Sequence, residues 1–207
     1  MNEVASLQRE PELAAASPAR RAVFVDKDGT LVVDVPYNVD PGRLRFTPSA
    51  LAGLRVLADA GFAIIVVTNQ PGLASGRFTR REFAALERAL RQRARDEGGV
   101  EIAAIYCCPH APGADGRLRC LCRKPAPGLL RQAARSHGLD LGRCWLVGDI
   151  LDDVEAGHRA GCRSVLLDVG NETEWRLSPI RTPDGRCADL AEAAEFILAR
   201  QAREAMP

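Results

Sequence analysis

Lysine is almost missing from this chain of 207 residues: only Lys27 and Lys124 stand among its 28 basic residues, and the other 26 are arginines. No run of eighteen apolar residues occurs, which argues against a helix that crosses a bilayer. The net charge of +1 provides no broad basic surface, which argues against nucleic acid or an anionic membrane as a partner. A lysine is therefore an unusual choice in this sequence.

The first twenty residues lack the apolar stretch of a secretion signal, so we expect a cytoplasmic protein. Residues 1–20 have weak helical periodicity and predict a loosely ordered extension. With 46% hydrophobic residues overall, residues 21–207 predict one domain that buries a full core without disulfides. We expect this domain to act as a monomer.

Short apolar runs alternate with amphipathic stretches throughout the domain. The runs predict strands at 22–26, 62–68, 102–106, 144–149 and 164–168. The amphipathic stretches predict helices at 48–60, 80–97, 127–137, 152–160 and 188–203. In the first helix we expect Val56 to share the buried face of Leu54 and Leu57. The alternation predicts an α/β, Rossmann-like fold: a parallel sheet with helices on both faces.

Three polar residues, Asp26, Thr68 and Asp149, stand at the ends of predicted strands. Because ligands of such sheets bind beyond the carboxyl ends of the strands, we expect the three to share one site. Asp26 begins the pentapeptide Asp-Lys-Asp-Gly-Thr. Its carboxylate can attack a phosphate monoester to form an aspartyl-phosphate, and Asp28 can protonate the leaving alkoxide and later deprotonate water. Lys27, between the two acids, receives no role.

These motifs follow the order found in the haloacid dehalogenase superfamily of phosphatases, which the chain resembles. The matching stretches are 26–30, 68–70, Lys124 and 148–149. The resemblance implies that the Thr68 hydroxyl and the Lys124 ammonium bind the transferring phosphoryl group. Asp26, Asp149 and the backbone carbonyl of Asp28 would then provide oxygen ligands for Mg²⁺. Asp153 is expected to support this metal site without ligating the ion.

Four potential metal ligands lie within fifteen residues: Cys108, His110, Cys120 and Cys122. In a chain without a secretion signal, such a cluster indicates metal binding more than disulfides. Three thiolates and one imidazole form a closed tetrahedral set for structural Zn²⁺ and leave no position for a reactive water. Cys107 is the competing ligand. We therefore predict a zinc-bound loop insertion at 107–125.

The zinc loop runs directly into Arg123 and Lys124, so a bound metal would hold both residues over the phosphate site. Only 39 residues separate Asp28 from Thr68, and they include a helix. This leaves no room for a large cap domain between them. The substrate must therefore be contacted by loops.

Within the superfamily, the zinc-loop motif and Thr68-Asn-Gln70 resemble the heptose bisphosphate phosphatases, over about residues 22–168. That family removes the 7-phosphate of a heptose 1,7-bisphosphate during synthesis of lipopolysaccharide precursors. The resemblance places substrate contacts on these residues: Asp34, Tyr37, Thr68, Asn69, Gln70, Arg123 and Lys124.

Two other functions stay open on the sequence. Histidinol-phosphate phosphatases share the zinc loop, and a non-catalytic zinc-containing module that binds a phosphorylated ligand is a third possibility. Ile150 stands where the heptose enzymes have a substrate-binding lysine, and Pro36 replaces a more flexible residue. These departures bear on the sugar more than on the chemistry. Residues 170–184 have no counterpart that we can interpret.

Overall fold

The computed structural model describes residues 20–113 and 119–204; the predicted extension at 1–20, apart from Arg20, lies outside them. Six parallel strands form one sheet in the order β3-β2-β1-β4-β5-β6. The strands are β1 (Ala22–Val25), β2 (Ala63–Asn69), β3 (Ile102–Cys108), β4 (Trp145–Gly148), β5 (Arg163–Leu167) and β6 (Gly185–Cys187). The predicted parallel, Rossmann-like sheet is confirmed.

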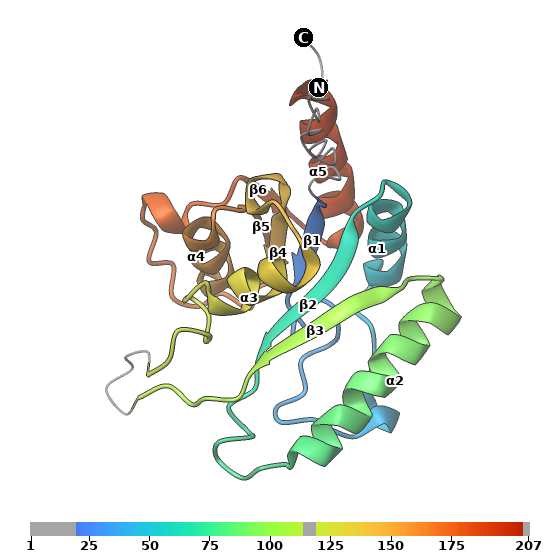
Figure 1. Ribbon diagram of the computed structural model, residues 1–207, viewed down its shortest axis with the longest axis vertical. Helices are drawn as coiled ribbons and strands as arrows, with labels where there is room; N and C mark the ends of the chain where they lie inside the picture. The colour runs from blue at the N-terminus through green and yellow to red at the C-terminus, as the bar shows by residue number, and fades with distance from the viewer. Residues whose placement is uncertain (1–19, 114–118, 205–207) are drawn as a thin grey trace, which may run out of the picture.

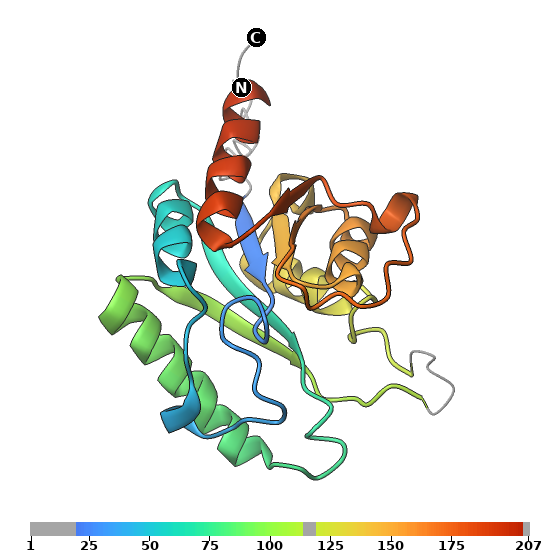
Figure 2. The same ribbon diagram turned by 180° about the vertical axis from the view of Figure 1, so that it is seen from behind.

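Helices cover both faces of the sheet (Figures 1 and 2). They are α1 (Ala50–Asp59), α2 (Arg80–Gly98), α3 (Gly128–His137), α4 (Leu151–Ala160) and α5 (Leu190–Glu204). Three short 3-10 turns lie at Pro41–Arg43, Leu141–Arg143 and Pro179–Arg181. Between β1 and β2 the chain adds only one such turn and α1, so no separate cap stands there.

The two faces of the sheet carry separate cores because neighbouring strand residues point in opposite directions. Val23 and Val25 of β1 pack in the cluster that includes side chains of α1, α2 and α5. Ala22 and Phe24 of the same strand join the cluster with α3 and α4. Every residue of β1 is buried, as expected of a central parallel strand.

Helix α1 buries Leu54 and Leu57 completely against the sheet. Val56 is 44% exposed, so the prediction that it shares this face is wrong. Residues three apart lie on one side of a helix, whereas Val56 is offset from Leu54 by two positions and turns away. None of the helices in the two described ranges is long and apolar enough to cross a membrane.

Strand order reverses at β1, which has β2 on one side and β4 on the other. The connections that leave β1 and β4 therefore diverge at their carboxyl ends and open a crevice. Asp26 directly follows β1 and Asp149 directly follows β4. The backbone N–H of Asp26 donates to Val147 O at 2.9 Å, which fixes the two strand ends side by side.

The connection from β5 to β6, which the sequence left unexplained, passes over α4 (Figure 2). It is held there by His158 of α4, whose Nδ1 lies 2.9 Å from Ile180 O and whose Nε2 lies 2.9 Å from Asp184 Oδ2. Because both ring nitrogens face acceptors, the charged imidazolium is the form that satisfies both. The hydrogen bond to Asp184 is the main cause that raises the pKa of His158 above its ordinary value, against partial burial.

We expect His158 to make stability pH-dependent. A histidine whose pKa is raised by folding stabilises the protein fully below its unfolded value of 6.5, and this contribution is lost as the pH rises through the raised pKa. Urea unfolding of the wild type and of His158→Gln at about pH 5.5 and about pH 8.5 measures this contribution. The difference in free energy of unfolding between the two proteins should be larger at the lower pH. A difference that does not change with pH would contradict the assignment, and Asp184→Asn should remove the same trend.

Candidate active site

The fold brings five predicted catalytic or metal-binding residues together at the carboxyl edge of the sheet. They line one cleft of about 330 Å³, and all but Asp28 are at most 8% exposed: Asp26, Asp28, Thr68, Lys124 and Asp149. Thr68 belongs to β2, whereas Lys124 comes from the long connection between β3 and α3. Charged groups are rarely buried without partners, so their contacts define what the site can do.

Lys124 lies between two carboxylates. Its Nζ is 2.5 Å from Asp26 Oδ1 and 2.5 Å from Asp153 Oδ1, and it also donates to Val67 O at 3.2 Å. Burial alone would lower the pKa of this ammonium, but the carboxylates of Asp153 and Asp26 raise it above its ordinary value. Lys124 is therefore a fixed positive charge at neutral pH. Asp153, expected to support the metal site, contacts this lysine directly.

Three buried carboxylates are grouped beside the Lys124 ammonium, which contacts two of them. Oxygens of Asp26, Asp149 and Asp153 lie within 4.8 Å of one another. Burial raises the pKa of Asp26 to about 7, and the charges of Asp153 and Asp28 add to this, while Lys124 opposes it. Burial, and then the neighbouring charge of Asp26, also raises the pKa of Asp149. The excess negative charge and the oxygen-only donor set fit a hard divalent cation such as Mg²⁺.

Asp149 is held on both oxygens. Thr30 Oγ1 donates to its Oδ1 at 2.7 Å, and Asn171 Nδ2 donates to its Oδ2 at 2.8 Å. Asn171 belongs to the connection between β5 and β6, and the sequence analysis missed it. Its only sequence signal was its place just after the last predicted strand, where a parallel sheet returns the chain to the same edge.

Gly29 permits this close packing. Its φ of +83° lies in the left-handed region, and a Cβ there would stand 2.3 Å from Asp149 Oδ2 and 2.6 Å from Asn171 Nδ2. Any larger residue would therefore be strained and would also push the Asp149 carboxylate aside. The glycine of the pentapeptide is required by the position of Asp149.

Asp28 and Thr68 are linked through Gln70. Nε2 of Gln70 donates to Asp28 Oδ2 at 2.8 Å and to Thr68 Oγ1 at 2.9 Å. Because the Thr68 oxygen accepts from Gln70, its own proton can be donated to a phosphate oxygen. The other Asp28 oxygen forms an ion pair with Lys27, a contact that the sequence analysis did not anticipate.

Asn69, predicted as a substrate contact, holds the backbone of Lys124. Its Nδ2 donates to Lys124 O at 3.2 Å, and its Oδ1 accepts from Lys124 N at 3.1 Å. The paired hydrogen bonds tie the end of β2 to the residue that carries the buried ammonium. Asn69 also lines the cleft. Its substrate contact stays a prediction.

A second cleft of about 310 Å³ continues from the first. It is lined by predicted substrate residues from separate segments: Asp34, Tyr37, Asn69, Gln70 and Arg123. Burial, and then the charge of Asp28, raises the pKa of Asp34. Tyr37 is 49% exposed, and the guanidinium of Arg77 lies 5.0 Å from the centre of its ring.

Cys108, His110, Cys120 and Cys122 form the cluster that their spacing predicted. Five of the six distances between their ligand atoms are 3.2–3.7 Å, and all four atoms lie within 4.8 Å of one another. Tetrahedral zinc with Zn–S bonds of about 2.3 Å requires edges of roughly 3.6–3.8 Å, so the set fits the ion after a small expansion. Among the residues that the structure describes, Cys107, the competing ligand, does not belong to this cluster. Adjacent residues of β3 point to opposite faces, so Cys107 faces away from Cys108.

The thiols of the ligand cluster differ in acidity: burial raises the pKa of Cys108 and Cys122, whereas that of Cys120 is lowered. Burial alone would raise the pKa of the Cys120 thiol, but hydrogen bonds from the Arg123 backbone N–H and the Cys122 thiol lower it to about 7. The backbone N–H of Arg123 donates to Cys120 Sγ at 3.3 Å, and Nη1 of the Arg123 side chain donates to His110 O at 3.3 Å. The cluster therefore contacts the residue immediately before Lys124. Figure 1 shows that the chain after β3 extends beyond the carboxyl ends of the strands, on the side of the site.

Comparison with known proteins identifies the family. The family model described as "HAD-hyrolase-like" matches residues 121–193. The D-glycero-beta-D-manno-heptose-1,7-bisphosphate 7-phosphatase of Pseudomonas aeruginosa is 34% identical over 183 residues, which cover 87% of this chain and 99% of that protein. The chain belongs to the heptose bisphosphate phosphatase family. The enzyme of the same name from Escherichia coli is 34% identical and covers 86% of the chain and 87% of its own length.

Solved structures agree with this membership in the heptose bisphosphate phosphatase family. The D,D-heptose 1,7-bisphosphate phosphatase of Bordetella bronchiseptica, complexed with magnesium and phosphate, has a TM-score of 0.71 and 31% identity and covers 87% of this chain and 99% of its own. A HAD-like phosphatase of Mesorhizobium loti has a TM-score of 0.72 and 33% identity. The match covers 90% of this chain and 88% of that protein's chain. The chain is thus a hydrolase of the phosphatase class, and the non-catalytic interpretation is not favoured.

Replacing Gly29 by alanine should weaken magnesium activation. We expect Gly29→Ala to raise the Mg²⁺ concentration for half-maximal activity by about tenfold or more, because the new methyl group displaces a predicted metal ligand. Gly76→Ala is the matched control, since Gly76 has φ +66° and nothing within 4 Å of an added Cβ. Both variants should lose about 1–2 kcal/mol of stability from backbone strain, but only Gly29→Ala should change the metal titration. Equal titrations would contradict the argument.

Zinc content should depend on four ligands and not on the neighbouring cysteine. Metal analysis of the wild type should give about one Zn²⁺ per chain, and Cys108→Ser or Cys122→Ser should give well under one. Both variants should lose phosphatase activity because Lys124 is no longer anchored. Cys107→Ser is the matched control and should keep zinc and activity. A wild type that lacks zinc and is unaffected by chelators would refute the site.

Proposed function

We propose that this chain is a Mg²⁺-dependent phosphatase that removes the 7-phosphate of a heptose 1,7-bisphosphate through an aspartyl-phosphate on Asp26. The observation that carries the chemistry is the buried ammonium of Lys124, in contact with both Asp26 and Asp153 at the strand-order reversal. The observation that carries the substrate is the identity to named heptose bisphosphate phosphatases across nearly the full chain.

The first step transfers the phosphoryl group. Oδ1 of Asp26 is held by Lys124, which leaves Oδ2 to attack phosphorus. The bond from phosphorus to the sugar oxygen breaks, and Asp28 donates a proton to that oxygen. Lys124 and the Thr68 hydroxyl bind the equatorial oxygens, where negative charge gathers in the transition state.

The second step releases phosphate. A water attacks phosphorus, Asp28 takes its proton, and the Asp26 carboxylate is restored. When bound by Asp26, Asp149 and the Asp28 carbonyl, Mg²⁺ supplies positive charge that offsets the repulsion between substrate and nucleophile. Zinc in the cysteine cluster would hold the Arg123–Lys124 backbone in place and take no part in bond breaking.

The leaving sugar fits the second cleft, beside Asp34, Tyr37 and Arg123. The guanidinium of Arg123 suits a second phosphate or sugar hydroxyls because its planar donors can bind two oxygens at once. Relatives with similar identity are named for both anomers, beta in Yersinia pestis at 36% and alpha in Photorhabdus laumondii at 35%. We propose a heptose substrate and leave its anomer to the assay.

Phosphate release across a substrate panel tests the proposal. We expect kcat/KM for one heptose 1,7-bisphosphate anomer to exceed that for histidinol phosphate and an aryl phosphate by about a hundredfold or more, because only the bisphosphate fills both clefts. Asp26→Asn should lose roughly a thousandfold or more on every substrate. Rapid quenching with labelled substrate should trap phosphorus on Asp26 of the wild type.

Two results would reject this assignment. Histidinol phosphate as the preferred substrate would reject the heptose. Full Mg²⁺-dependent activity in Asp26→Asn would reject the nucleophile and, with it, the covalent intermediate.

A further inference from the structure

Lys27 has a buried ammonium that the motif chemistry leaves unused. The residue is 4% exposed, and its Nζ forms an ion pair with Asp28 Oδ1. Removing an ammonium from water is costly, so such a group persists where a partner carboxylate compensates it. Both lysines of this chain thus contact the paired carboxylates of the pentapeptide: Lys124 contacts Asp26, and Lys27 contacts Asp28.

The second oxygen of Asp28 is held from another element. Gln70 Nε2 donates to Asp28 Oδ2 at 2.8 Å, and the backbone N–H of Gln70 donates to Cys108 O of β3 at 2.8 Å. Lys27 therefore approaches from the turn after β1, and Gln70 approaches from the end of β2. Because the Asp28 side chain is 28% exposed, it would be free to rotate toward solvent without these two donors.

We propose that Lys27 and Gln70 are positioning residues that hold the Asp28 carboxylate in the orientation required for proton transfer. The inference rests on the proposed function, in which Asp28 exchanges a proton with the leaving sugar and then with water. Neither residue has to touch the phosphoryl group. A positioned acid–base group contributes about 10²–10⁴-fold to rate, and a misplaced one loses part of that contribution.

The two chemical steps depend on Asp28 to different degrees when the leaving group is good. An aryl phosphate releases a stable phenolate, so attack by Asp26 breaks the bond from phosphorus to oxygen with little help from Asp28. Hydrolysis still requires it: the water oxygen bonds to phosphorus, the bond to Asp26 breaks with its electron pair returning to the carboxylate, and the water proton passes to Asp28. Misplacing Asp28 should therefore slow the second step selectively.

Stopped-flow assays with p-nitrophenyl phosphate and Mg²⁺ test this. Lys27→Met should release about one p-nitrophenolate per active site in a fast burst, followed by a steady-state rate at least about tenfold below that of the wild type. Its Michaelis constant should rise by no more than about threefold. Gln70→Leu should also slow the second step, and because Gln70 donates to Thr68 Oγ1 as well, this variant should raise the Michaelis constant more than Lys27→Met does. Lys27→Arg, which keeps a cationic donor, should recover most of the rate.

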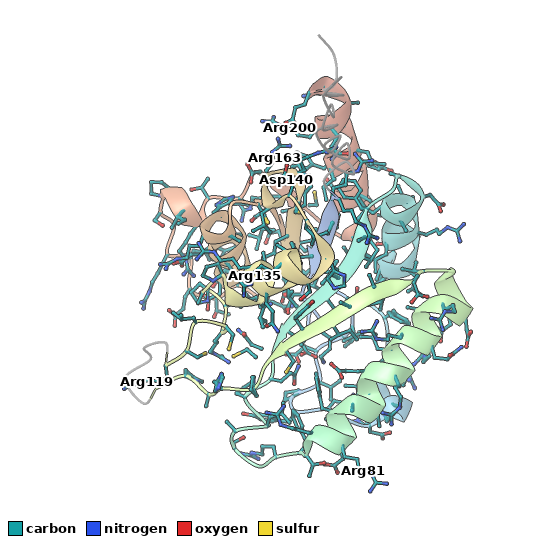
Figure 3. The ribbon with its side chains drawn as sticks, in the orientation of Figure 1. Arg81, Arg119, Arg135, Asp140, Arg163 and Arg200 are labelled. Atoms are coloured by element: carbon teal, nitrogen blue, oxygen red, sulfur yellow. The ribbon has the colours of Figure 1, made fainter. Side chains whose placement is uncertain are left out.

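A double-mutant cycle separates positioning from general damage. If Lys27 acts through Asp28, Lys27→Met should not lower the steady-state rate further in an Asp28→Asn background. Arg81→Met is the control for loss of a cation, because Arg81 is exposed at the start of α2 and points away from the site (Figure 3). Arg81→Met should leave both the burst and the steady-state rate unchanged.

Two results would overturn the proposal. One is that Lys27→Met lowers the steady-state rate by the same factor in the wild-type and Asp28→Asn backgrounds. The other is that Lys27→Met raises the Michaelis constant and leaves the rate unchanged. The former would indicate damage to the fold, and the latter would make Lys27 a direct substrate contact. Failure of the proposed function is distinguishable, because it appears in the wild type as the lack of a trapped phosphate on Asp26.

Discussion

A single buried ammonium organises the site. Lys124 lies between Asp26 and Asp153, and its positive charge offsets part of the cost of burying their negative charges. The lysine in turn needs support, because its backbone belongs to a long connection and not to a helix or strand. Asn69 provides that support from β2, and the cysteine cluster provides it from the other side through Arg123. The surroundings of the Asp26 carboxylate thus depend on groups well outside its own strand.

Charge balance distinguishes the two candidate metal sites. The cleft holds more carboxylates than ammonium groups, and the resulting repulsion, together with burial, keeps the pKa of Asp26 high until a divalent ion offsets it. The Cys/His cluster presents a complete set of four ligands and so favours an ion that fixes structure. One set of ligands therefore suits chemistry and the other suits loop geometry, and Lys124 is the residue through which they meet.

The sequence was sufficient where local patterns decide the outcome. Apolar runs located five strands, and an acid at the end of a run located Asp26 and Asp149. Strand β6 was missed because Gly-Arg-Cys has no β-branched or alternating pattern and forms only by pairing with β5. The partners of His158, the contact of Asn171 with Asp149 and the burial of Lys27 were missed for the same reason. Each depends on which distant segments the folded chain places side by side.

The reach of Asn171 to Asp149 has an evolutionary consequence. The amide comes from a connection that carries none of the family motifs, yet it helps to set the orientation of a motif carboxylate. Two proteins with identical motifs can therefore differ in how firmly that carboxylate is held, and so in the ion supply at which each works best. Divergence in this one loop would therefore shift the magnesium requirement of such phosphatases while every signature residue stays unchanged.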